Sequence, residues 1–395
     1  MTGSGPLPIL PALNAAEAAH SAALLQRILQ CIEAAGGYLD FEAFMTLALY
    51  APGLGYYSAG STKIGAAGDF TTAPEISALF TRCVARQCAQ ILALTPGASI
   101  LELGAGTGSM AAGVLRELAA LQALPVHYDI LEVSADLAGR QAEHLAGLPD
   151  ELRSRVRWLQ QLPATPMAGV ILANEVLDAL PCRRFVTQAT GVEELGVSRT
   201  AAGQLAWARR PAAAALTAAV QDINAALDAP LVPGYASEVC LLADPWIASL
   251  AACLRRGALL LFDYGLPRRQ YYHPDRTRGT LTCHFKHRLH FDPLIALGVQ
   301  DITAWVDFTR VALAGHAADL EVLGFGTQAG FLLGAGIEAL LGQAEGAAAQ
   351  SRLASEARRL LMPGEMGEAF KLLALGRGLD APLAGFRHQD LRDSL

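Results

Sequence analysis

Apolar residues recur at helical spacing near the start of the chain. Between residues 15 and 35 they return every three or four positions, and Gly36-Gly37 end the pattern, which is typical of an amphipathic helix. Similar stretches run over residues 40–50 and from about residue 76 to residue 94. The pattern therefore predicts an α-helical N-terminal region with one long loop before its third helix.

After Pro96-Gly97 the pattern changes to short apolar runs that alternate with amphipathic stretches. Strands are predicted at residues 99–103, 126–133, 155–159 and 169–173, and helices at residues 109–121 and 135–145. This alternation indicates βαβ units and a parallel sheet with helices on both faces. Because crossovers between parallel strands are right-handed, the sheet should be doubly wound.

The second half of the chain is predicted to complete this sheet and to add segments to it. A central strand is expected at residues 257–264, and two late strands are expected to close the sheet as an antiparallel pair. The late strands are residues 320–325 and 369–375. Before them we expect a hairpin excursion at residues 185–208 and two helices, at residues 211–227 and about 238–254. Residues 267–306 show no clean period, so we expect a long functional loop there.

The fold class is therefore α/β, a Rossmann-like sheet with an N-terminal helical addition and inserted hairpin and loop segments. We expect the helical region at residues 1–95 and the sheet domain at residues 96–395. The insertions into the sheet domain are expected at about 183–235 and 265–318.

Composition narrows the classes of function. The 395 residues are 52% hydrophobic and 17% charged, as in a globular protein. A net charge of -7 argues against a general nucleic-acid binder, which needs a basic face. No apolar run reaches the roughly 18 residues of a membrane span. Seven cysteines without a CxxC pair suggest reduced thiols, and the N-terminus resembles neither a secretory signal nor an Arg-rich transit peptide. We therefore expect a cytoplasmic protein.

A glycine-rich loop, Leu-Glu-Leu-Gly-Ala-Gly-Thr-Gly at residues 101–108, follows the first predicted strand and opens a helix. Its glycines, Gly104, Gly106 and Gly108, lack the third glycine of the dinucleotide spacing. Glu102 would repel a phosphate but suits a sulfonium and an amino group. Glu132, 24 residues after Gly108, can accept hydrogen bonds from ribose hydroxyls. The loop therefore favours S-adenosylmethionine over a nicotinamide cofactor.

A second set of polar residues follows the strand predicted at residues 169–173. Asn174, Glu175 and Asp178 follow it directly, at the sheet edge where a substrate meets the cofactor. An amide and two carboxylates can hold a nitrogen nucleophile, and paired carboxylates suit a guanidinium. Alternatively, Asn174 and Asp178 cap a helix that follows.

Several motifs together resemble one known family. They are the segments 68–75, 101–108, 131–134, 173–181, 263–265 and 301–308. The chain resembles the MidA family of class I methyltransferases, which is related to a mitochondrial complex I assembly factor. The resemblance implies a seven-stranded methyltransferase sheet and, for the mitochondrial relative, symmetric dimethylation of an arginine on a complex I subunit.

The resemblance also implies roles for individual residues. Gly68, Asp69, Pro74 and Glu75 would fold over the cofactor, whose other contacts would be Glu102, Gly104, Gly106, Gly108, Glu132 and Asn174. Asn174, Glu175 and Asp178 would be the catalytic residues facing the acceptor. The partner would be a protein substrate, such as a respiratory complex I subunit, with no nucleic acid. The pairs Tyr56-Tyr57 and Tyr271-Tyr272 suit a core or a homodimer surface.

The sequence also allows three other interpretations. Cys283, His284, His287 and His290 are crowded into eight residues without a distant partner pair, so a basic loop is favoured over a metal site. A cofactor-binding assembly chaperone without chemistry is disfavoured, because it has no need of Asn174 and Glu175. In a small-molecule methyltransferase, residues 267–306 and the N-terminal helices would form a closed pocket.

Overall fold

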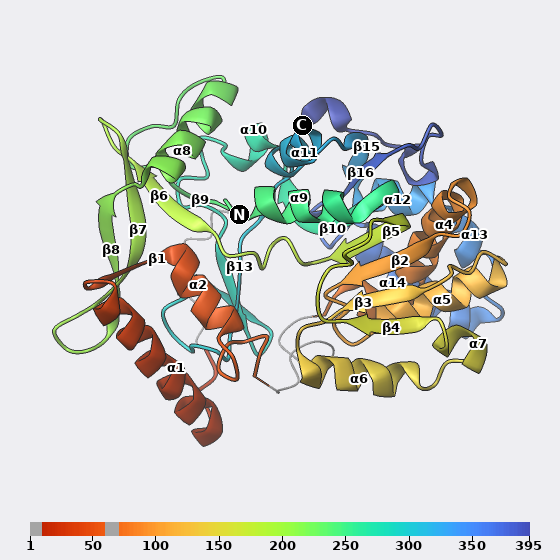
Figure 1. Cartoon of the computed structure of the whole chain (residues 1–395), viewed down its shortest axis with the longest axis horizontal. Coiled ribbons are helices and arrows are strands. Elements are labelled where there is room, and N and C mark those ends of the chain that lie inside the picture. Colours follow the sequence, from red (N-terminus) through yellow and green to blue (C-terminus); the bar gives the residue numbers. More distant parts are fainter. Residues whose placement is uncertain (1–9, 60–70) are drawn as a thin grey trace. The chain divides into compact units, whose positions relative to one another are not determined.

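The computed structural model describes residues 10–59 and 71–395 (Figure 1). Contacts divide the chain into two compact units. We call residues 1–70, 178–242 and 268–305 the N-terminal unit, and residues 71–177, 243–267 and 306–395 the sheet unit. The boundary expected near residue 95 stays a prediction about domains; the contacts group residues 71–95 with the sheet.

The sheet unit is built on a mostly parallel sheet, which confirms the predicted fold class. Its strands are β2 (Ser99–Leu103), β3 (Tyr128–Leu131), β4 (Val156–Leu159), β5 (Met167–Asn174), β10 (Leu254–Leu266), β15 (Glu321–Thr327) and β16 (Phe370–Arg377). The strand order is β15-β16-β10-β5-β2-β3-β4, and the short β14 (Val306–Asp307) pairs with β10. Strand β16 is antiparallel to both of its neighbours, so the two late strands pair as the sequence predicted.

Helices cover both faces of this sheet. On one face, Leu260 and Phe262 of β10 belong to a core cluster with Val84 of α4 (Ala78–Leu94) and Leu115 of α5 (Ser109–Ala120). On the other face, α11 (Phe308–Ala317) packs so closely that a Cβ on its Gly315 would lie 2.7 Å from a methyl carbon of Leu375. The sheet is therefore doubly wound.

Further helices complete the sheet unit. They are α3 (Ala73–Ile76), α6 (Ala135–Leu145), α7 (Asp150–Arg153), α9 (Ala243–Cys253), α12 (Gln328–Gly334), α13 (Ile337–Leu341), α14 (Ala347–Leu361), η1 (Ala384–Phe386) and η2 (Arg392–Ser394). The helix expected from residue 76 starts at Ala78, because the Ser77 hydroxyl caps it by accepting the Leu79 N–H at 3.1 Å.

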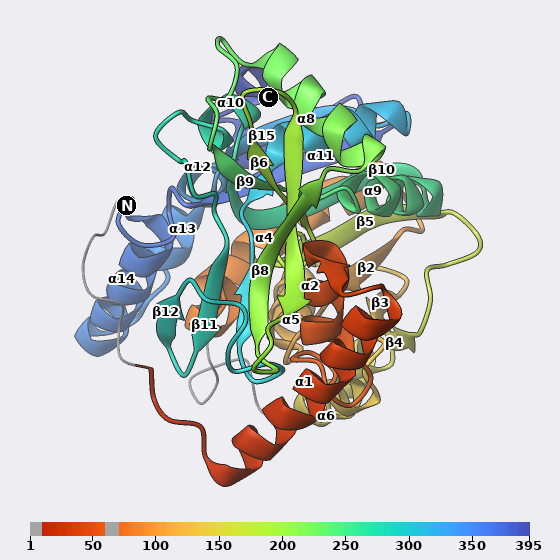
Figure 2. The same cartoon turned by 90° about the vertical axis from the view of Figure 1, so that its left-hand side faces the viewer.

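The N-terminal unit joins helices to an antiparallel sheet (Figure 2). Its elements are α1 (Ala15–Ala34), β1 (Tyr38–Asp40), α2 (Phe41–Tyr50), β6 (Arg183–Thr187), β7 (Val192–Arg199), β8 (Leu205–Pro211), α8 (Ala214–Ala226) and β9 (Ala236–Val239). The strands run in the order β1-β7-β6-β9, with β8 on β7. The hairpin excursion expected at residues 185–208 is therefore confirmed.

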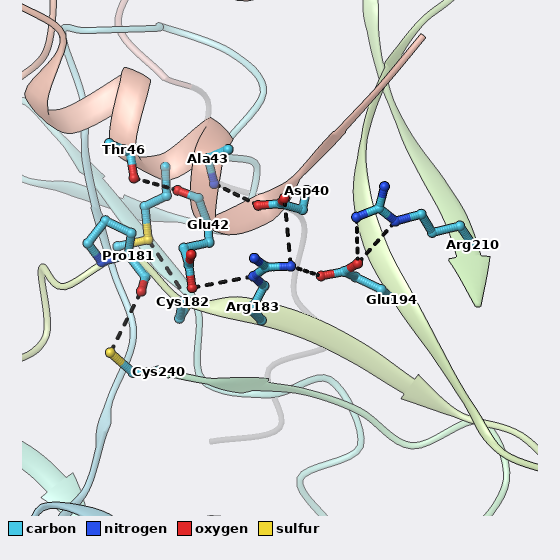
Figure 3. Close-up of polar contacts among 11 residues, drawn as sticks. Asp40, Glu42, Ala43, Thr46, Pro181, Cys182, Arg183, Glu194, Arg210 and Cys240 are labelled. Carbon is cyan, nitrogen blue, oxygen red and sulfur yellow. Dashed lines mark hydrogen bonds and ion pairs between the residues drawn. The ribbon is translucent and has the colours of Figure 1, made fainter. Parts of the chain in front are cut away.

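An ion network holds the strands of this antiparallel sheet together (Figure 3). Glu194 of β7 has a fully buried side chain, which lies 2.7 Å from Arg183 of β6 and 3.0 Å from Arg210 of β8. Arg183 also lies 3.6 Å from Asp40 and 3.3 Å from Glu42. The network therefore joins β1, α2, β6, β7 and β8.

Two expectations about local structure were wrong. The helix expected from residue 238 starts at Ala243, because Glu238 and Val239 belong to β9, where they pair with Arg184 and Arg183 of β6. The loop expected at residues 267–306 contains a helix and a small sheet. These are α10 (Arg268–Tyr271), β11 (Thr282–Phe285), β12 (Arg288–His290) and β13 (Asp301–Thr303). Strands of three or four residues are too short to show a period in the sequence.

Among the described residues, no helix combines the length and the apolar character needed to cross a membrane.

Candidate functional site

The glycine loop links the central strand β2 to α5. Gly104, Gly106 and Gly108 have φ values of 62°, 54° and 85°, and Gly108 is the N-cap of α5. This left-handed conformation costs other residues about 1–2 kcal/mol each, which explains the alternating glycines. The loop contains no Lys or Arg, so it lacks the cations that commonly help to hold a phosphate.

A segment that precedes this loop in the sequence is hydrogen-bonded to it. The Thr107 hydroxyl donates a hydrogen bond to Oε1 of Glu75, which lies with Pro74 in α3. Thr107 Oγ1 also lies 2.9 Å from Ser109 Oγ. The predicted Glu75 therefore contacts the glycine loop, whereas Gly68 and Asp69 lie outside the described residues.

Glu132 follows β3 at the same edge of the sheet. Its Oε1 accepts the Ser134 N–H at 2.8 Å, and its Oε2 accepts a hydrogen bond from Gln141 Nε2 at 3.1 Å. Burial raises the pKa of Glu132, and these two hydrogen bonds partly offset the rise. The carboxylate is half-buried, so ribose hydroxyls could still reach it.

Gln141 of α6 is a residue that sequence reasoning missed. Its Nε2 donates to the Gly106 carbonyl at 3.0 Å as well as to Glu132, and its Oε1 accepts from Trp158 Nε1 at 3.0 Å. It thus joins the glycine loop to Glu132. No local motif marks it, because its partners come from three other parts of the chain.

Glu102 lies inside the sheet unit. Its side chain is 2% exposed and accepts the Tyr128 hydroxyl at 2.7 Å. Burial raises its pKa to about 7, although the Tyr128 hydrogen bond acts in the opposite direction. Its expected role toward the sulfonium and amino group of the cofactor stays a prediction.

Asn174 is the last residue of β5, which lies next to β2 in the sheet, and Glu175 follows it. Glu175 has φ 55°, and its N–H donates to the Phe262 carbonyl of β10 at 2.9 Å. Asn174 Nδ2 lies 3.1 Å from Glu175 Oε1. In the described chain no helix lies between β5 and β6, so the alternative of a helix cap for Asn174 and Asp178 is wrong.

Asp178 belongs to the N-terminal unit and is 6% exposed. Its carbonyl accepts the Ala304 N–H at 3.0 Å. Together with burial, the charges of Asp301 and Asp178 raise the pKa of the Tyr57 hydroxyl well above its ordinary value. The sequence did not single out Asp301 and Tyr57 as site residues, although Tyr57 donates to Asp301 Oδ1 at 2.9 Å.

The carboxyl edge of the parallel sheet thus gathers most of the predicted residues. The glycine loop follows the first strand of the sheet, Glu132 the second, and Asn174-Glu175 the fourth. This arrangement defines a class I S-adenosylmethionine-dependent methyltransferase. Residues 83–326 match the family model described as S-adenosyl-L-methionine-dependent methyltransferase, and the chain belongs to this family. The resemblance to the MidA-type methyltransferases is therefore confirmed.

A solved relative bears on the cofactor. A crystal structure of a methyltransferase-superfamily protein from Burkholderia thailandensis, bound to S-adenosyl-homocysteine, is 41% identical, with a TM-score of 0.93. The match covers 98% of this chain and all of that one. S-adenosylmethionine is therefore the cofactor, as predicted. The residues present fit it, because the loop lacks cations and Glu132 is half-buried.

Curated relatives carry more specific names. The proteins of Danio rerio and Mus musculus are both named protein arginine methyltransferase NDUFAF7, mitochondrial. The first is 28% identical and the match covers 86% of this chain and 84% of that protein; the second is 29% identical, with 91% and 86% covered. The mitochondrial assignment of these relatives overturns the expectation of a cytoplasmic protein.

Proposed function

We propose that this methyltransferase modifies arginine side chains of a protein substrate and forms symmetric dimethylarginine. The names of the curated relatives support arginine as the acceptor. The resemblance to the mitochondrial assembly factor supports a respiratory complex I subunit as the substrate. We also propose a homodimer as the assembly; the paired tyrosines do not form its surface, because Tyr56, Tyr271 and Tyr272 are buried.

The observation that carries the proposal is the conformation of Glu175. A glutamate at φ 55° is in a region that residues with a side chain seldom adopt. Such outliers cluster at functional sites, where the surrounding structure imposes them. Here the hydrogen bond from the Glu175 N–H to Phe262 and that from the Leu177 N–H to Asp263 Oδ2, at 2.9 Å, hold the turn on β10.

The side chains at this turn have the chemistry that a guanidinium requires. Glu175 offers carboxylate oxygens to its N–H groups, and such charge-assisted hydrogen bonds are stronger than neutral ones. Asn174, hydrogen-bonded to Glu175 Oε1, fixes the direction of that oxygen. In the proposal the pair orients the acceptor nitrogen.

The cofactor supplies an activated methyl group on its sulfonium. The chain's own residues position the reactants: the glycine loop and Glu132 hold the donor, and Glu175 holds the guanidinium for in-line attack. As the bond between the acceptor nitrogen and the methyl carbon forms, the bond from that carbon to the sulfonium sulfur would break and leave a thioether, and one N–H proton must leave the acceptor nitrogen. In the proposal Glu175 Oε2 accepts it.

Glu175→Gln tests this role. It keeps the size of the side chain and an acceptor for Asn174 but removes the charge. We expect the dissociation constant of S-adenosylhomocysteine to stay within about twofold, while methyl transfer falls by about two orders of magnitude or more. Calorimetric titration measures the first quantity. Transfer of a tritiated methyl group from S-adenosylmethionine to a protein extract of cells lacking this chain measures the second.

The matched control is Glu143→Gln, an exposed glutamate of α6, which should leave both quantities unchanged. Wild-type transfer by Glu175→Gln would show that the carboxylate has no part in the reaction.

Mass spectrometry of methylated arginines tests the substrate class. Symmetric dimethylarginine peptides should disappear from cells lacking this chain and return with the wild-type protein but not with Glu175→Gln. An unchanged arginine methylome with a newly methylated small molecule would instead support a small-molecule methyltransferase. Binding of S-adenosylhomocysteine with no transfer to any component of the extract would support an assembly chaperone.

A further inference from the structure

Two cysteines flank strands β6 and β9 at the ends where these strands are adjacent. All seven cysteines lie within the described residues, and none of them is in a disulfide there. Cys182 directly precedes β6, and Cys240 directly follows β9. Both strands belong to the N-terminal unit.

The register of these strands sets the two cysteines opposite each other. Strands β6 and β9 are antiparallel, with Arg183 opposite Val239 as the last pair. One further step along both strands brings Cys182 opposite Cys240. The Thr187 N–H donates to the Tyr235 carbonyl at 3.0 Å, so the odd residues of β6 hydrogen-bond to β9. The cysteines therefore occupy a non-hydrogen-bonded position, in which Cα atoms are about 4.5 Å apart.

The side chains at this position share one face of the sheet. Residues two apart on a strand point to the same side, and Arg184 and Glu238, next on this face, form an ion pair at 3.0 Å. Cys240 Sγ lies 3.7 Å from the carbonyl oxygen of Pro181, the residue bonded to Cys182 (Figure 3). Burial, followed by Glu238 and Cys240, raises the pKa of the Cys182 thiol well above its ordinary value.

We propose that Cys182 and Cys240 form a reversible disulfide across β6 and β9 when the protein meets a low-molecular-weight disulfide. Disulfides require Cα separations of about 4.4–6.8 Å, which a non-hydrogen-bonded antiparallel pair meets. Cys240 is partly exposed and Cys182 is 1% exposed, so Cys240 is the thiol that the oxidant reaches first.

The reaction is two successive thiol–disulfide exchanges. The Cys240 thiolate attacks one sulfur of the oxidant, which forms a mixed disulfide and releases one small thiol. The Cys182 thiolate then attacks Cys240 Sγ, which forms the protein disulfide and releases the second small thiol. Two protein thiols and one small disulfide thus become one protein disulfide and two small thiols.

Oxidation should also change the packing of α2. In the reduced protein Cys182 Sγ lies 4.0 Å from Sδ of Met45, a buried residue of α2. A bond to Cys240 turns this sulfur toward β9. We therefore expect faster hydrogen exchange in the turn of α2 around Met45 after oxidation.

The test uses the full chain in mixtures of reduced and oxidised glutathione. The samples are quenched with acid, alkylated, digested without reduction and analysed by mass spectrometry. We expect a linked peptide pair containing Cys182 and Cys240, lighter than its reduced parts by two hydrogen atoms. Cys240→Ser should lose it, and Cys31→Ser, at another partly exposed cysteine, should retain it. Links between other cysteines, or a glutathione adduct at Cys240 that never resolves, would overturn the proposal.

Cys182→Ala gives a second measurement that does not need the linked product. It removes the thiol that completes the second exchange, so the glutathione adduct at Cys240 should accumulate in the variant and not in the wild-type protein. If this variant fails to fold, the rate at which the glutathione adduct of the wild-type protein resolves provides the test. Because the Cys182 thiol must ionise, resolution of the adduct should accelerate by roughly tenfold per pH unit, and a rate independent of pH would contradict the mechanism.

Discussion

Glu102 carries a carboxyl group into the interior of the sheet unit, where burial raises its pKa to about 7. Below pH 4.5 the group is neutral in both the folded and the unfolded chain. As the pH rises toward 7, the unfolded chain ionises first, so the contribution of Glu102 to stability is progressively lost. Well above pH 7 the cost reaches about 3 kcal/mol.

Glu102→Gln keeps an acceptor for the Tyr128 hydroxyl and cannot ionise. We expect the variant to exceed the wild-type free energy of unfolding by about 3 kcal/mol at pH 8 and by less than about 1 kcal/mol at pH 5. Urea unfolding of both proteins without cofactor measures the difference. A difference that is the same at both pH values would show that Glu102 is already ionised at pH 5 in the folded protein, as it is in the unfolded chain.

At the residue scale, the sequence singled out candidate residues whose backbone conformation or place in the chain follows from local chemistry. Gly104, Gly106 and Gly108 show a spacing that left-handed backbone requires, and Glu175 follows directly after an apolar strand. The role of Gln141 could not be predicted, because its amide bridges segments that only the folded chain brings together.

At the scale of elements, Glu193 and Glu194 are adjacent on β7 and have contrasting surroundings. The side chain of Glu194 is fully buried between Arg183 and Arg210, whereas Glu193 is 36% exposed and lies 3.6 Å from Arg209. Removing one partner of a buried ion pair leaves uncompensated charge and costs about 3–5 kcal/mol. An exposed pair contributes about 1 kcal/mol or less.

We therefore expect Glu194→Ala to lower the free energy of unfolding by about 3 kcal/mol, and Glu193→Ala to lower it by less than about 1 kcal/mol. Arg183 retains Asp40 and Glu42, so the loss should fall at the low end of the range. Denaturant unfolding followed by circular dichroism compares the two variants. Equal losses would mean that strand pairing, and not the buried carboxylate, stabilises this sheet.

Element length decided which secondary structure the sequence could predict. The strand at residues 99–103 and the helix at residues 135–145 were predicted with their observed ends. Strands β11, β12 and β13 were missed, since three or four residues are too few to show a period. Their pairing depends on contacts between segments up to 21 residues apart, such as Thr282 with Thr303.

At the scale of the whole molecule, the two units are interleaved along the chain. The N-terminal unit takes three separate segments and the sheet unit takes the other three. A sequence read from one end to the other predicts contiguous domains with insertions, because each change of composition marks only a local boundary. Which segments share a core is decided by long-range packing, as when Phe44, Cys182 and Ile302 join one cluster.

This division into two units predicts which of them the cofactor product S-adenosylhomocysteine stabilises. S-adenosylhomocysteine at one hundred times its dissociation constant should stabilise the sheet unit by about 2.7 kcal/mol. Exchange of amide hydrogens that open only when this unit unfolds, such as those of Ile100 and Ile130, should slow by roughly a hundredfold.

Glu132→Ala should lose about 1–3 kcal/mol of binding free energy with its hydrogen bonds to the ribose. At the same ligand concentration its protection should therefore fall to about twentyfold or less. Asp136→Ala, at an exposed acid of α6 paired with Arg140, should keep the wild-type protection. Hydrogen exchange with mass spectrometry measures all three proteins, and full protection in Glu132→Ala would show that another residue holds the ribose.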